Sequence, residues 1–265
     1  MSTRALRTAA SGMYAQQVNI EVISNNIANI NTTSFKKNRA EFKDLMYQEV
    51  NTTPLNSYVP GVNENTNSKI QIGNGIQTST TQKLFTQGDM QSTGNKFDVG
   101  IQGEGFFQVR KADGTFAYTR DGAFKLSSDG SLVTANGYVL EPGIRLNSDV
   151  LEVSVSRDGV VTATEVGGNN VELGTLELAK FQNPGGLVAL GDNMYSETTE
   201  SSTPILGTPG ANGFGELHQG YLEASNVDIV EEMVSMITAQ RAYEINYKTV
   251  KTVEDMISMV NNLKR

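Results

Sequence analysis

The fold is decided by residues 226–262, NVDIVEEMVSMITAQRAYEINYKTVKTVEDMISMVNN. This stretch contains neither glycine nor proline, so it can form one uninterrupted helix. Apolar and aromatic residues recur in it at every seventh position, at Ile229, Met236, Tyr243, Val250 and Ile257, reinforced by Val253 and Val260. A helix of about 35 residues is about 52 Å long. A compact chain of this length is about 47 Å across. The helix is therefore too long for an ordinary core helix, and we expect it to project from a body.

A second heptad pattern occupies the first thirty residues. Its apolar positions are Leu6, Met13, Ile20 and Ile27, with Ala9, Gln16 and Ile23 three residues after the first three. We expect the two helices to pair along these stripes. Two alternatives remain open at this point: a helical hairpin within one subunit, or helices that also pack against other copies. Polar residues on or beside the seams, Gln16, Asn25, Gln240 and Asn246, favour the second alternative.

The N-terminal helix is expected to end in an asparagine-rich segment, SNNIANINTTSFKK, residues 24–37. Asn25 and Asn29 are four residues apart and share a helix face. Their amides are expected to donate and accept hydrogen bonds across subunit contacts. Replacing both with alanine should impair assembly while the body stays folded. At the other helix, Ser225 or Asn226 is the expected N-cap, and Glu232 places negative charge in the first turn.

Between residues 84 and 220 the pattern changes to short alternating or aromatic runs separated by turn dipeptides. These are Asp113-Gly114, Asp121-Gly122, Asp129-Gly130, Asn136-Gly137 and Asp158-Gly159. Asp-Gly and Asn-Gly supply the positive φ angles of tight hairpin turns. The spacing predicts an antiparallel β-meander, followed by strands over 151–156, 160–166 and 173–181.

The fold class predicted is α+β, with long N- and C-terminal helices paired as a coiled coil. The predicted parts are an N-terminal helix and junction over 1–46, an extended polar arm over 47–83, a β domain over 84–220 and a C-terminal helix over 221–265. The polar arm has few apolar anchors, so a disordered linker is the alternative. Alternation in Lys69-Ile70-Gln71-Ile72 favours an arm ordered against a neighbour.

Composition excludes several classes of function. The net charge of −8 provides no basic stripe for nucleic acid and no polybasic run for an anionic membrane. Cysteine is absent, which excludes disulfides and thiolate metal sites. His218 is the only histidine, and no G-x-S-x-G elbow or carboxylate pair accompanies it. We expect no enzyme activity, no cofactor and no metal site.

Three stretches resemble signatures of the bacterial flagellar rod and hook protein family. They are ALRTAASGMYAQQVNIEVISNNIANINTTSFKKNRAEF (5–42), FDVGIQGEGFFQVRKADGTFAYTRDGAFKLSSDGSLVTANGYVL (97–140) and GYLEASNVDIVEEMVSMITAQRAYEINYKTVKTVEDMISMV (220–260). Within the family, subunits of the distal rod resemble the chain best, by length, by the ending QRAYEINYKTVKTVEDM and by the polar segment near 47–76. Subunits of the proximal rod come next.

The resemblance implies a structural subunit that polymerises into a helical tube and transmits torque from motor to hook across the periplasm. The implied partners are further copies of the chain, the proximal rod, the hook, the surrounding ring proteins and the flagellar export apparatus, with no direct membrane insertion. Export by that apparatus fits the absence of a cleaved signal peptide. A secreted β-rich hydrolase and an adhesin with a helical stalk are the alternatives.

The free subunit is expected to have largely disordered ends. About nine apolar side chains in one stripe contribute roughly 1.5–3 kcal/mol each. Ordering about 65 helical residues costs about 1–2 kcal/mol per residue in backbone entropy, offset partly by hydrogen bonds. Because the stripe alone does not clearly outweigh this cost, we expect the helices to fold as subunits assemble.

Overall fold

The computed structural model describes residues 2–51, 69–146, 150–165 and 170–263. The chain forms two compact units. The helical unit comprises Met1–Asn26, Asn38–Gln82 and Ile229–Arg265, and the β unit comprises Ile27–Lys37 and Lys83–Asp228. The chain therefore crosses four times between the units.

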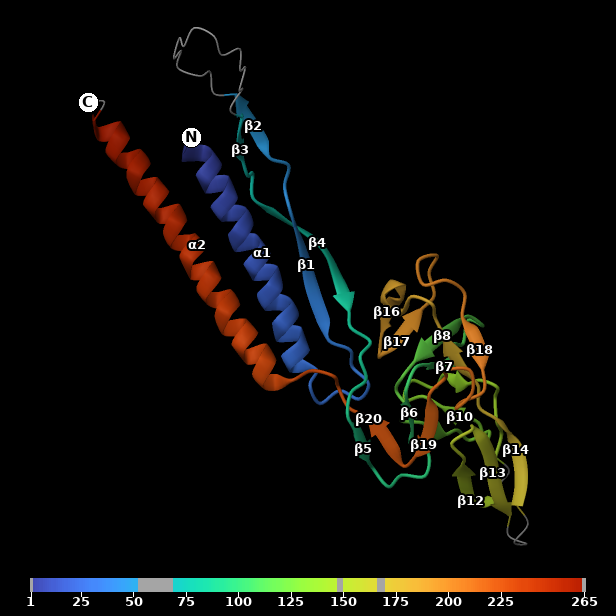
Figure 1. Cartoon of the computed structure of the whole chain (residues 1–265). Helices are drawn as coiled ribbons and strands as arrows, with labels where there is room; N and C mark the ends of the chain where they lie inside the picture. The colour runs from blue at the N-terminus through green and yellow to red at the C-terminus, as the bar shows by residue number, and fades with distance from the viewer. Residues whose placement is uncertain (1, 52–68, 147–149, 166–169, 264–265) are drawn as a thin grey trace. The chain divides into compact units, whose positions relative to one another are not determined.

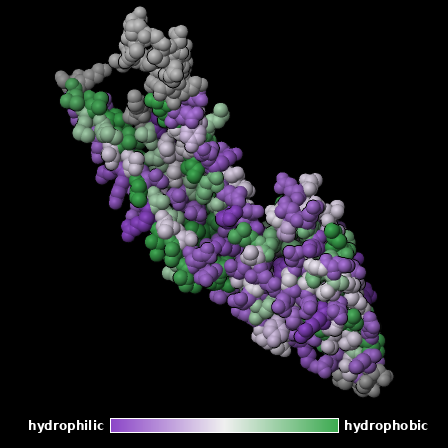
Figure 2. Space-filling view, viewed as in Figure 1, coloured by the Kyte–Doolittle hydropathy of each residue, from purple (hydrophilic) through white to green (hydrophobic). Residues whose placement is uncertain are grey.

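The helical unit contains the two predicted helices. Helix α1 runs over Ser2–Ala28 and helix α2 over Ile229–Leu263, a length of 35 residues. The two lie side by side and antiparallel (Figure 1), so that the end of α1 meets the start of α2. Apolar patches lie at both ends of α2, with polar colour between them (Figure 2). No helix in the described ranges combines the length and apolarity needed to cross a membrane.

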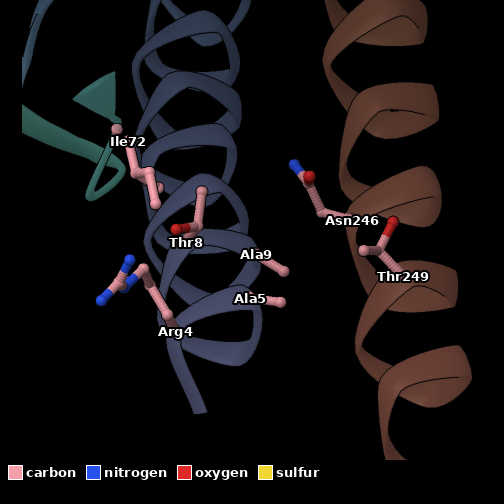
Figure 3. A pocket seen from close by; sticks show the side chains of 8 residues that line it. Arg4, Ala5, Thr8, Ala9, Ile72, Asn246 and Thr249 are labelled. Carbon is pink, nitrogen blue, oxygen red and sulfur yellow. The ribbon is translucent and has the colours of Figure 1, made fainter. Parts of the chain in front are cut away.

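Strands of the same unit pair in antiparallel ribbons. They are β1 (Asn38–Asp44) with β4 (Ile76–Lys83), and β2 (Gln48–Asn51) with β3 (Lys69–Ile72). These strands approach α1 where the Ile76 amide donates to Ser11 Oγ at 3.3 Å. A groove of about 440 Å³ lies between α1, α2 and the β3–β4 connection, and Ala5 and Ala9 point from α1 toward α2 in it (Figure 3).

The main sheet of the β unit is antiparallel. Its strands follow the order β16 (Val188–Gly191), β17 (Met194–Ser196), β8 (Phe116–Thr119), β7 (Phe106–Arg110), β11 (Val139–Leu140), β10 (Leu132–Val133) and β9 (Lys125–Leu126). A branch leaves β7 through β15 (Leu178–Lys180) to β18 (Ile205–Gly207). A short 3-10 helix, η1, spans Pro184–Gly186 before β16.

Smaller antiparallel sheets complete the unit. They are β12 (Val150–Val155), β13 (Val160–Glu165) and β14 (Asn170–Thr175) in one sheet, β6 (Val99–Gln102) with β19 (Glu216–Gln219), and β5 (Met90–Ser92) with β20 (Tyr221–Glu223). The last pair brings the chain to the start of α2.

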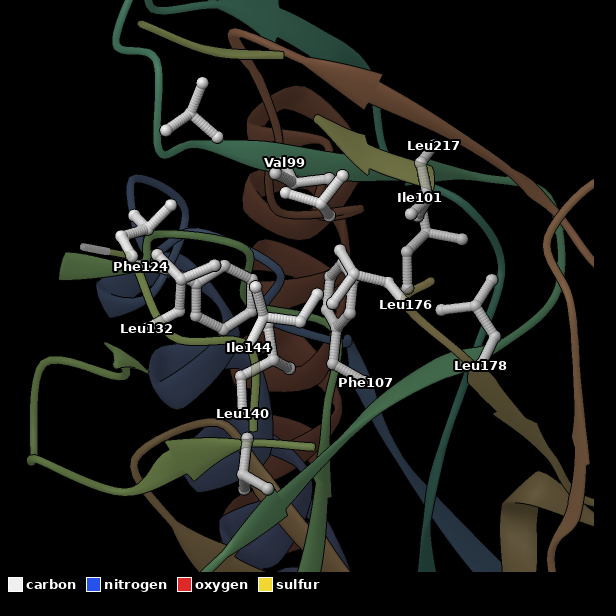
Figure 4. Packing of buried hydrophobic residues seen from close by; sticks show 14 of the residues in the cluster. Val99, Ile101, Phe107, Phe124, Leu132, Leu140, Ile144, Leu176, Leu178 and Leu217 are labelled. Atoms are coloured by element: carbon white, nitrogen blue, oxygen red, sulfur yellow. The ribbon is translucent and has the colours of Figure 1, made fainter. Parts of the chain in front are cut away.

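The core of the β unit is apolar and closely packed. Phe107 and Phe124 meet edge to face at 5.1 Å within it, surrounded by Val99, Ile101, Leu140 and Leu178 among others (Figure 4). A second, aromatic cluster contains Phe106, Tyr118, Phe181 and Tyr195. Aromatic pairs of this geometry add about 0.5–1.5 kcal/mol each beyond the burial of their area. The β unit therefore has the core of an independently stable body.

The Asp-Gly and Asn-Gly turns are confirmed at four of the five predicted sites. Gly114, Gly130, Gly137 and Gly159 have positive φ angles between +75° and +84°. The hairpin predicted at Asp121-Gly122 is wrong, because β8 pairs with β7 and β17 and not with β9. The Gly122 carbonyl instead accepts from the Val99 amide at 3.1 Å, so this glycine serves a close approach between two backbones.

Two further expectations need correction. The strand predicted over 173–181 is two strands, β14 and β15, because the chain changes sheet between them: β14 pairs with β13, whereas β15 pairs with β7 and β18.

Asn226 does not cap α2. Its side-chain oxygen accepts from the Lys37 amide at 2.7 Å, and its amide group donates to Leu84 O at 2.8 Å.

The stretch predicted as a polar arm, 47–83, contains β2, β3 and β4. Its residues 52–68 lie outside the described residues. The alternating stretch Lys69-Ile70-Gln71-Ile72 is β3 itself, paired in register with β2.

Candidate assembly surface

Helix α2 exposes a large apolar surface. Its exposed apolar and aromatic residues are Ile229, Val230, Met233, Val234, Ile237, Tyr243, Ile245, Tyr247, Met256, Met259, Val260 and Leu263. Met233 is 53% and Val260 64% exposed. Soluble monomers rarely expose contiguous apolar patches larger than a few hundred Å², and larger patches mark interaction sites.

The exposed apolar residues are densest at the two ends of the helix, over 229–237 and over 256–263. Between these two blocks, exposed Tyr243, Ile245 and Tyr247 are mixed with charged Arg241, Glu244 and Lys248. Arg241 and Glu244 form an ion pair at 2.9 Å in this middle section. The middle section of the helix is therefore mixed in character, whereas its two ends are predominantly apolar.

The predicted α2 stripe borders the buried side of the helix. Ile229 and Tyr243 are exposed, whereas Met236, Val250 and Ile257 are half-buried. The buried residues of α2 are Glu232, Ala239 and Val253. They form a row beside the predicted stripe, with a spacing of seven residues between the first two and fourteen between the last two. Of these, only Val253 was placed on the stripe by the sequence pattern.

The predicted α1 stripe shows the same offset. Leu6, Met13, Ile20 and Ile27 are all half-buried, while Ala9, Ala15, Ile23 and Asn26 are buried. In both helices the predicted stripe thus lies beside the buried row, whose members are mostly small or polar residues. The role of the stripe in assembly stays a prediction.

Small residues let the helices come close at one point. A Cβ on Gly12 would lie 2.9 Å from Nδ2 of Asn246, so the glycine makes room for that side chain. Asn246 and Thr249 line the groove from α2, opposite Arg4, Ala5 and Thr8 of α1 (Figure 3).

Asn26 forms the principal polar contact of the helical unit. It is 1% exposed. Its amide group donates to Asn38 O at 2.9 Å and to Glu232 Oε2 at 3.0 Å, and its oxygen accepts from the Asn38 amide at 2.9 Å. One side chain thereby connects α1, β1 and α2.

The sequence pattern selected different asparagines. Asn25 is exposed, and Asn29 is half-buried and accepts from the Thr32 hydroxyl at 3.2 Å. Their role in contacts between subunits stays a prediction. Asn26 was missed, although it lies three residues after Ile23 and so continues the buried row of α1.

A buried ionic group, which we call the junction cluster, lies where both chain ends enter the β unit. It consists of Lys36, Arg120 and Glu223. Glu223 accepts from Lys36 Nζ at 2.6 Å and from Arg120 Nε at 2.8 Å, and the side chains of all three are at most 4% exposed. The Gly88 amide donates to the same carboxylate at 2.9 Å.

Backbone contacts surround the junction cluster. The Ser34 amide donates to Glu223 O at 2.8 Å, and the Ser34 hydroxyl donates to Arg120 O at 2.8 Å. Lys36 Nζ also donates to Thr86 O at 2.8 Å. The segments that lead from α1 and toward α2 are thus fixed next to each other within the β unit.

The cluster is charged at neutral pH. Burial lowers the pKa of the Lys36 ammonium to about 8, although the Glu223 carboxylate counteracts this shift. Burial by itself raises the pKa of Glu223, but Arg120 and Lys36 outweigh it, so that pKa lies below its usual value. A buried carboxylate held by two cations and a backbone amide supports structure, and its removal leaves uncompensated charge.

Family comparisons place three segments of the chain. A model described as flagella basal body rod protein matches residues 6–36. One described as flagellar hook protein FlgE/F/G D1 domain matches 100–163, and one described as flagellar basal body rod FlgEFG protein C-terminal matches 218–263. Together these segments include α1, much of the main sheet and α2.

Relatives match the chain over nearly its full length. The flagellar basal-body rod protein FlgG of Borreliella burgdorferi is 48% identical over 269 residues, covering 99% of each chain. That of Agrobacterium fabrum is 47% identical, covering 98% of this chain and 100% of its own. That of Bacillus subtilis is 39% identical, covering 99% of each.

Proposed function

The chain belongs to the flagellar basal-body rod protein family, and we propose that it is a structural subunit of the distal part of that rod. Many copies stack into a helical tube that carries torque from the motor to the hook. Identity of 48% over 99% of each chain to a protein named FlgG supports this proposal.

The observation that carries the proposal is the exposed apolar face of α2. Each large apolar side chain contributes about 1.5–3 kcal/mol when it is fully buried. Two blocks of such residues on one helix provide a substantial driving force for association, and none of it is used within the subunit. A second copy that covers this face removes the apolar area from water.

The helices form the inner layer of the proposed tube. Within one subunit α1 and α2 pair as a coiled coil, with Asn26, Glu232 and Gly12 at the contact. A polar residue at a seam position specifies register at some cost in stability. The described strands of the stretch over 47–83, β2, β3 and β4, pack against neighbouring subunits in this proposal.

The junction cluster supports the transmission of torque. A load carried by the helices reaches the β unit through the segments around Lys36 and Glu223. Charge-assisted hydrogen bonds in a buried site are stronger than neutral ones. Their geometry favours a stiff connection, within the β unit, between the segments around Lys36 and Glu223.

The subunit acts through assembly and not through catalysis. It takes no cofactor, and its partners are further copies, the proximal rod, the hook, the ring proteins around the rod and the export apparatus. It works in the periplasmic section of the basal body.

Self-assembly of the purified full-length chain tests the proposal. Sedimentation and electron microscopy over a concentration series are expected to show tubes. A variant with Met233→Glu and Ile237→Glu, which are four residues apart on the exposed face of α2, is expected to remain unassembled.

The matched control adds the same charge elsewhere. Phe116→Glu with Val171→Glu changes exposed apolar residues of the β unit and is expected to assemble. Equal assembly of both variants, or no assembly of the parent chain at any concentration, would contradict the proposal.

A further inference from the structure

One path through the main sheet has two free ends. Strands β16, β17, β8, β7, β15 and β18 follow one another in antiparallel pairs. β16 pairs only with β17, and β18 pairs only with β15. Within the described residues, no hydrogen bond reaches the outer side of either strand.

The edge strand β16 is apolar and uncharged. Its sequence is VALG, and all four residues are exposed. Val188 is 52% exposed. The strand ends in a tight turn at Asp192 and Asn193, both with positive φ.

The edge strand β18 has the same character. Its sequence is ILG, with Ile205 61% exposed and Leu206 also exposed. Neither strand contains a charged residue or a proline. Exposed apolar edges of this kind are templates for pairing with another chain.

Three other edge strands of the β unit carry a charge. β9, at the far end of the main sheet, begins with Lys125, and the outer strands of the three-stranded sheet contain Glu152 and Glu172. Charged residues on edge strands prevent unwanted pairing. β5 and β6 also lack a charged residue, but β5 exposes the polar residues Gln91 and Ser92, and β6 is buried over 99–101. β16 and β18 combine the absence of charge with exposed apolar side chains, so pairing is tolerated at these two edges.

We propose that β16 of one copy pairs with β18 of a second copy, so that the main sheets of neighbouring β units join edge to edge. The occupant of each edge is a second copy because the chain itself carries both complementary edges, one at each end of the same path. A contact between two different edges leaves one free edge on each of the two copies, so further copies can add. It builds an open helical array wherever the rotation between copies does not close a ring. Such a contact fits the open helical array of the proposed function, on which this inference rests.

The joint is too small to act alone. The two strands have four and three residues, so their pairing buries well under roughly 800 Å² of surface. Areas below this value are typical of crystal contacts and not of stable interfaces. It therefore contributes only together with the helical contacts, which raise the effective concentration of one edge near the other. Substituting the edges should weaken the outer layer of the assembly while the contacts of α2 persist.

Cross-linking tests the joint directly, because the full-length chain has no native cysteine. One preparation carries Val188→Cys and another Ile205→Cys, and the two are mixed at high protein concentration with a short bismaleimide. Cross-linked dimers are expected in the mixture at about tenfold the yield of the control mixture described next. One cysteine per chain ensures that every cross-link joins two copies.

The control mixture pairs Ile205→Cys with Val171→Cys, an exposed apolar position on β14. Equal yields in both mixtures at every concentration would overturn the joint. Dimers of Val188→Cys with itself in the same yield would also overturn it, since they indicate a closed two-fold contact. Tube formation by the parent chain is followed separately, so failure of the joint is distinguishable from failure of the proposed function.

Discussion

At the residue scale, Asn26 connects three elements through one buried amide group. Its removal leaves the Glu232 carboxylate and both backbone groups of Asn38 without these partners. A buried polar group that loses its hydrogen bond costs about 1–3 kcal/mol, and more if it is charged.

We expect Asn26→Ala to destabilise the helical unit by about 2–4 kcal/mol. The measurement is the urea midpoint for dissociation of the assembled polymer. Ser24→Ala, two positions away on an exposed side chain, serves as the control and is expected to shift the free energy by about 0.5 kcal/mol or less. Equal losses in the two variants would refute the role of the buried amide.

Glu223 makes the stability of the β unit sensitive to acid. Its folded pKa lies below the ordinary value of 4.5. A carboxyl group with a depressed folded pKa contributes stability that is present above the unfolded pKa and is lost as pH falls through the folded pKa. The free energy of unfolding should therefore decrease as the pH is lowered past about 4.5.

Glu223→Gln should lower the stability at pH 7 by about 3–5 kcal/mol, because Lys36 and Arg120 stay buried without a counter-charge. It should also flatten the acid dependence. Urea unfolding followed by circular dichroism at pH 7 and pH 3.5 checks both. Glu152→Gln, which breaks the exposed pair with Lys96, is the control and should cost about 1 kcal/mol at most. A variant as acid-sensitive as the parent chain would contradict this explanation.

At the element scale, the helices and most hairpins followed from local patterns. The C-terminal helix was predictable because its heptads are unbroken by glycine or proline, and the hairpin turns because Asp-Gly and Asn-Gly favour positive φ. The Asp121-Gly122 hairpin failed because its glycine serves a tertiary contact with Val99, which no local signal distinguishes from a turn.

The polar contacts of the candidate site were not predictable for a related reason. The partners Asn26 and Glu232 are 206 residues apart, and Lys36 and Glu223 are 187 apart. In the sequence, each of these four residues resembles an ordinary polar or charged residue at a helix end or on the surface. Only the folded chain brings them together.

Gly122 gives a prediction about the β unit. A Cβ at this position would lie 1.7 Å from the Val99 carbonyl oxygen, which is backbone and cannot rotate away. Gly122→Ala should therefore destabilise the unit by about 3 kcal/mol or more. Gly114→Ala, with φ of +83° and no atom within 4 Å, should cost only about 1–2 kcal/mol. Thermal unfolding of both variants is the measurement, and similar losses would count against the backbone contact.

The helices should be ordered only in the assembly. In dilute monomer, amides over 229–257 should exchange rapidly with solvent, because one apolar stripe does not offset the entropy of ordering. In the polymer the same amides should be protected. Core strands such as β6 and β7 are the internal control and should be protected in both states. Strong protection of 229–257 in the monomer would contradict the expectation.

At the scale of the whole molecule, the charge of −8 opposes the association of copies. Salt screens this repulsion, since the Debye length falls from about 10 Å at 0.1 M to about 3 Å at 1 M. If apolar contacts drive assembly, the critical concentration should decrease by about three- to tenfold as sodium chloride rises over this range.

Sedimentation of the polymer at several salt concentrations provides the measurement. Glu200→Gln with Glu216→Gln changes two exposed residues and reduces the charge from −8 to −6. Its salt dependence should be weaker. An assembly that salt dissolves would instead indicate that ion pairs between copies dominate.

The junction also affects how the chain can be rebuilt. The Leu84 amide donates to Lys37 O at 2.9 Å, and the Ser34 amide donates to Glu223 O at 2.8 Å, so the outgoing and returning segments lie next to each other. The long segment of the β unit, residues 83–228, therefore starts and ends beside the same short stretch, residues 34–37. A foreign domain with closely spaced termini could replace this long segment if it kept the contacts to residues 34–37.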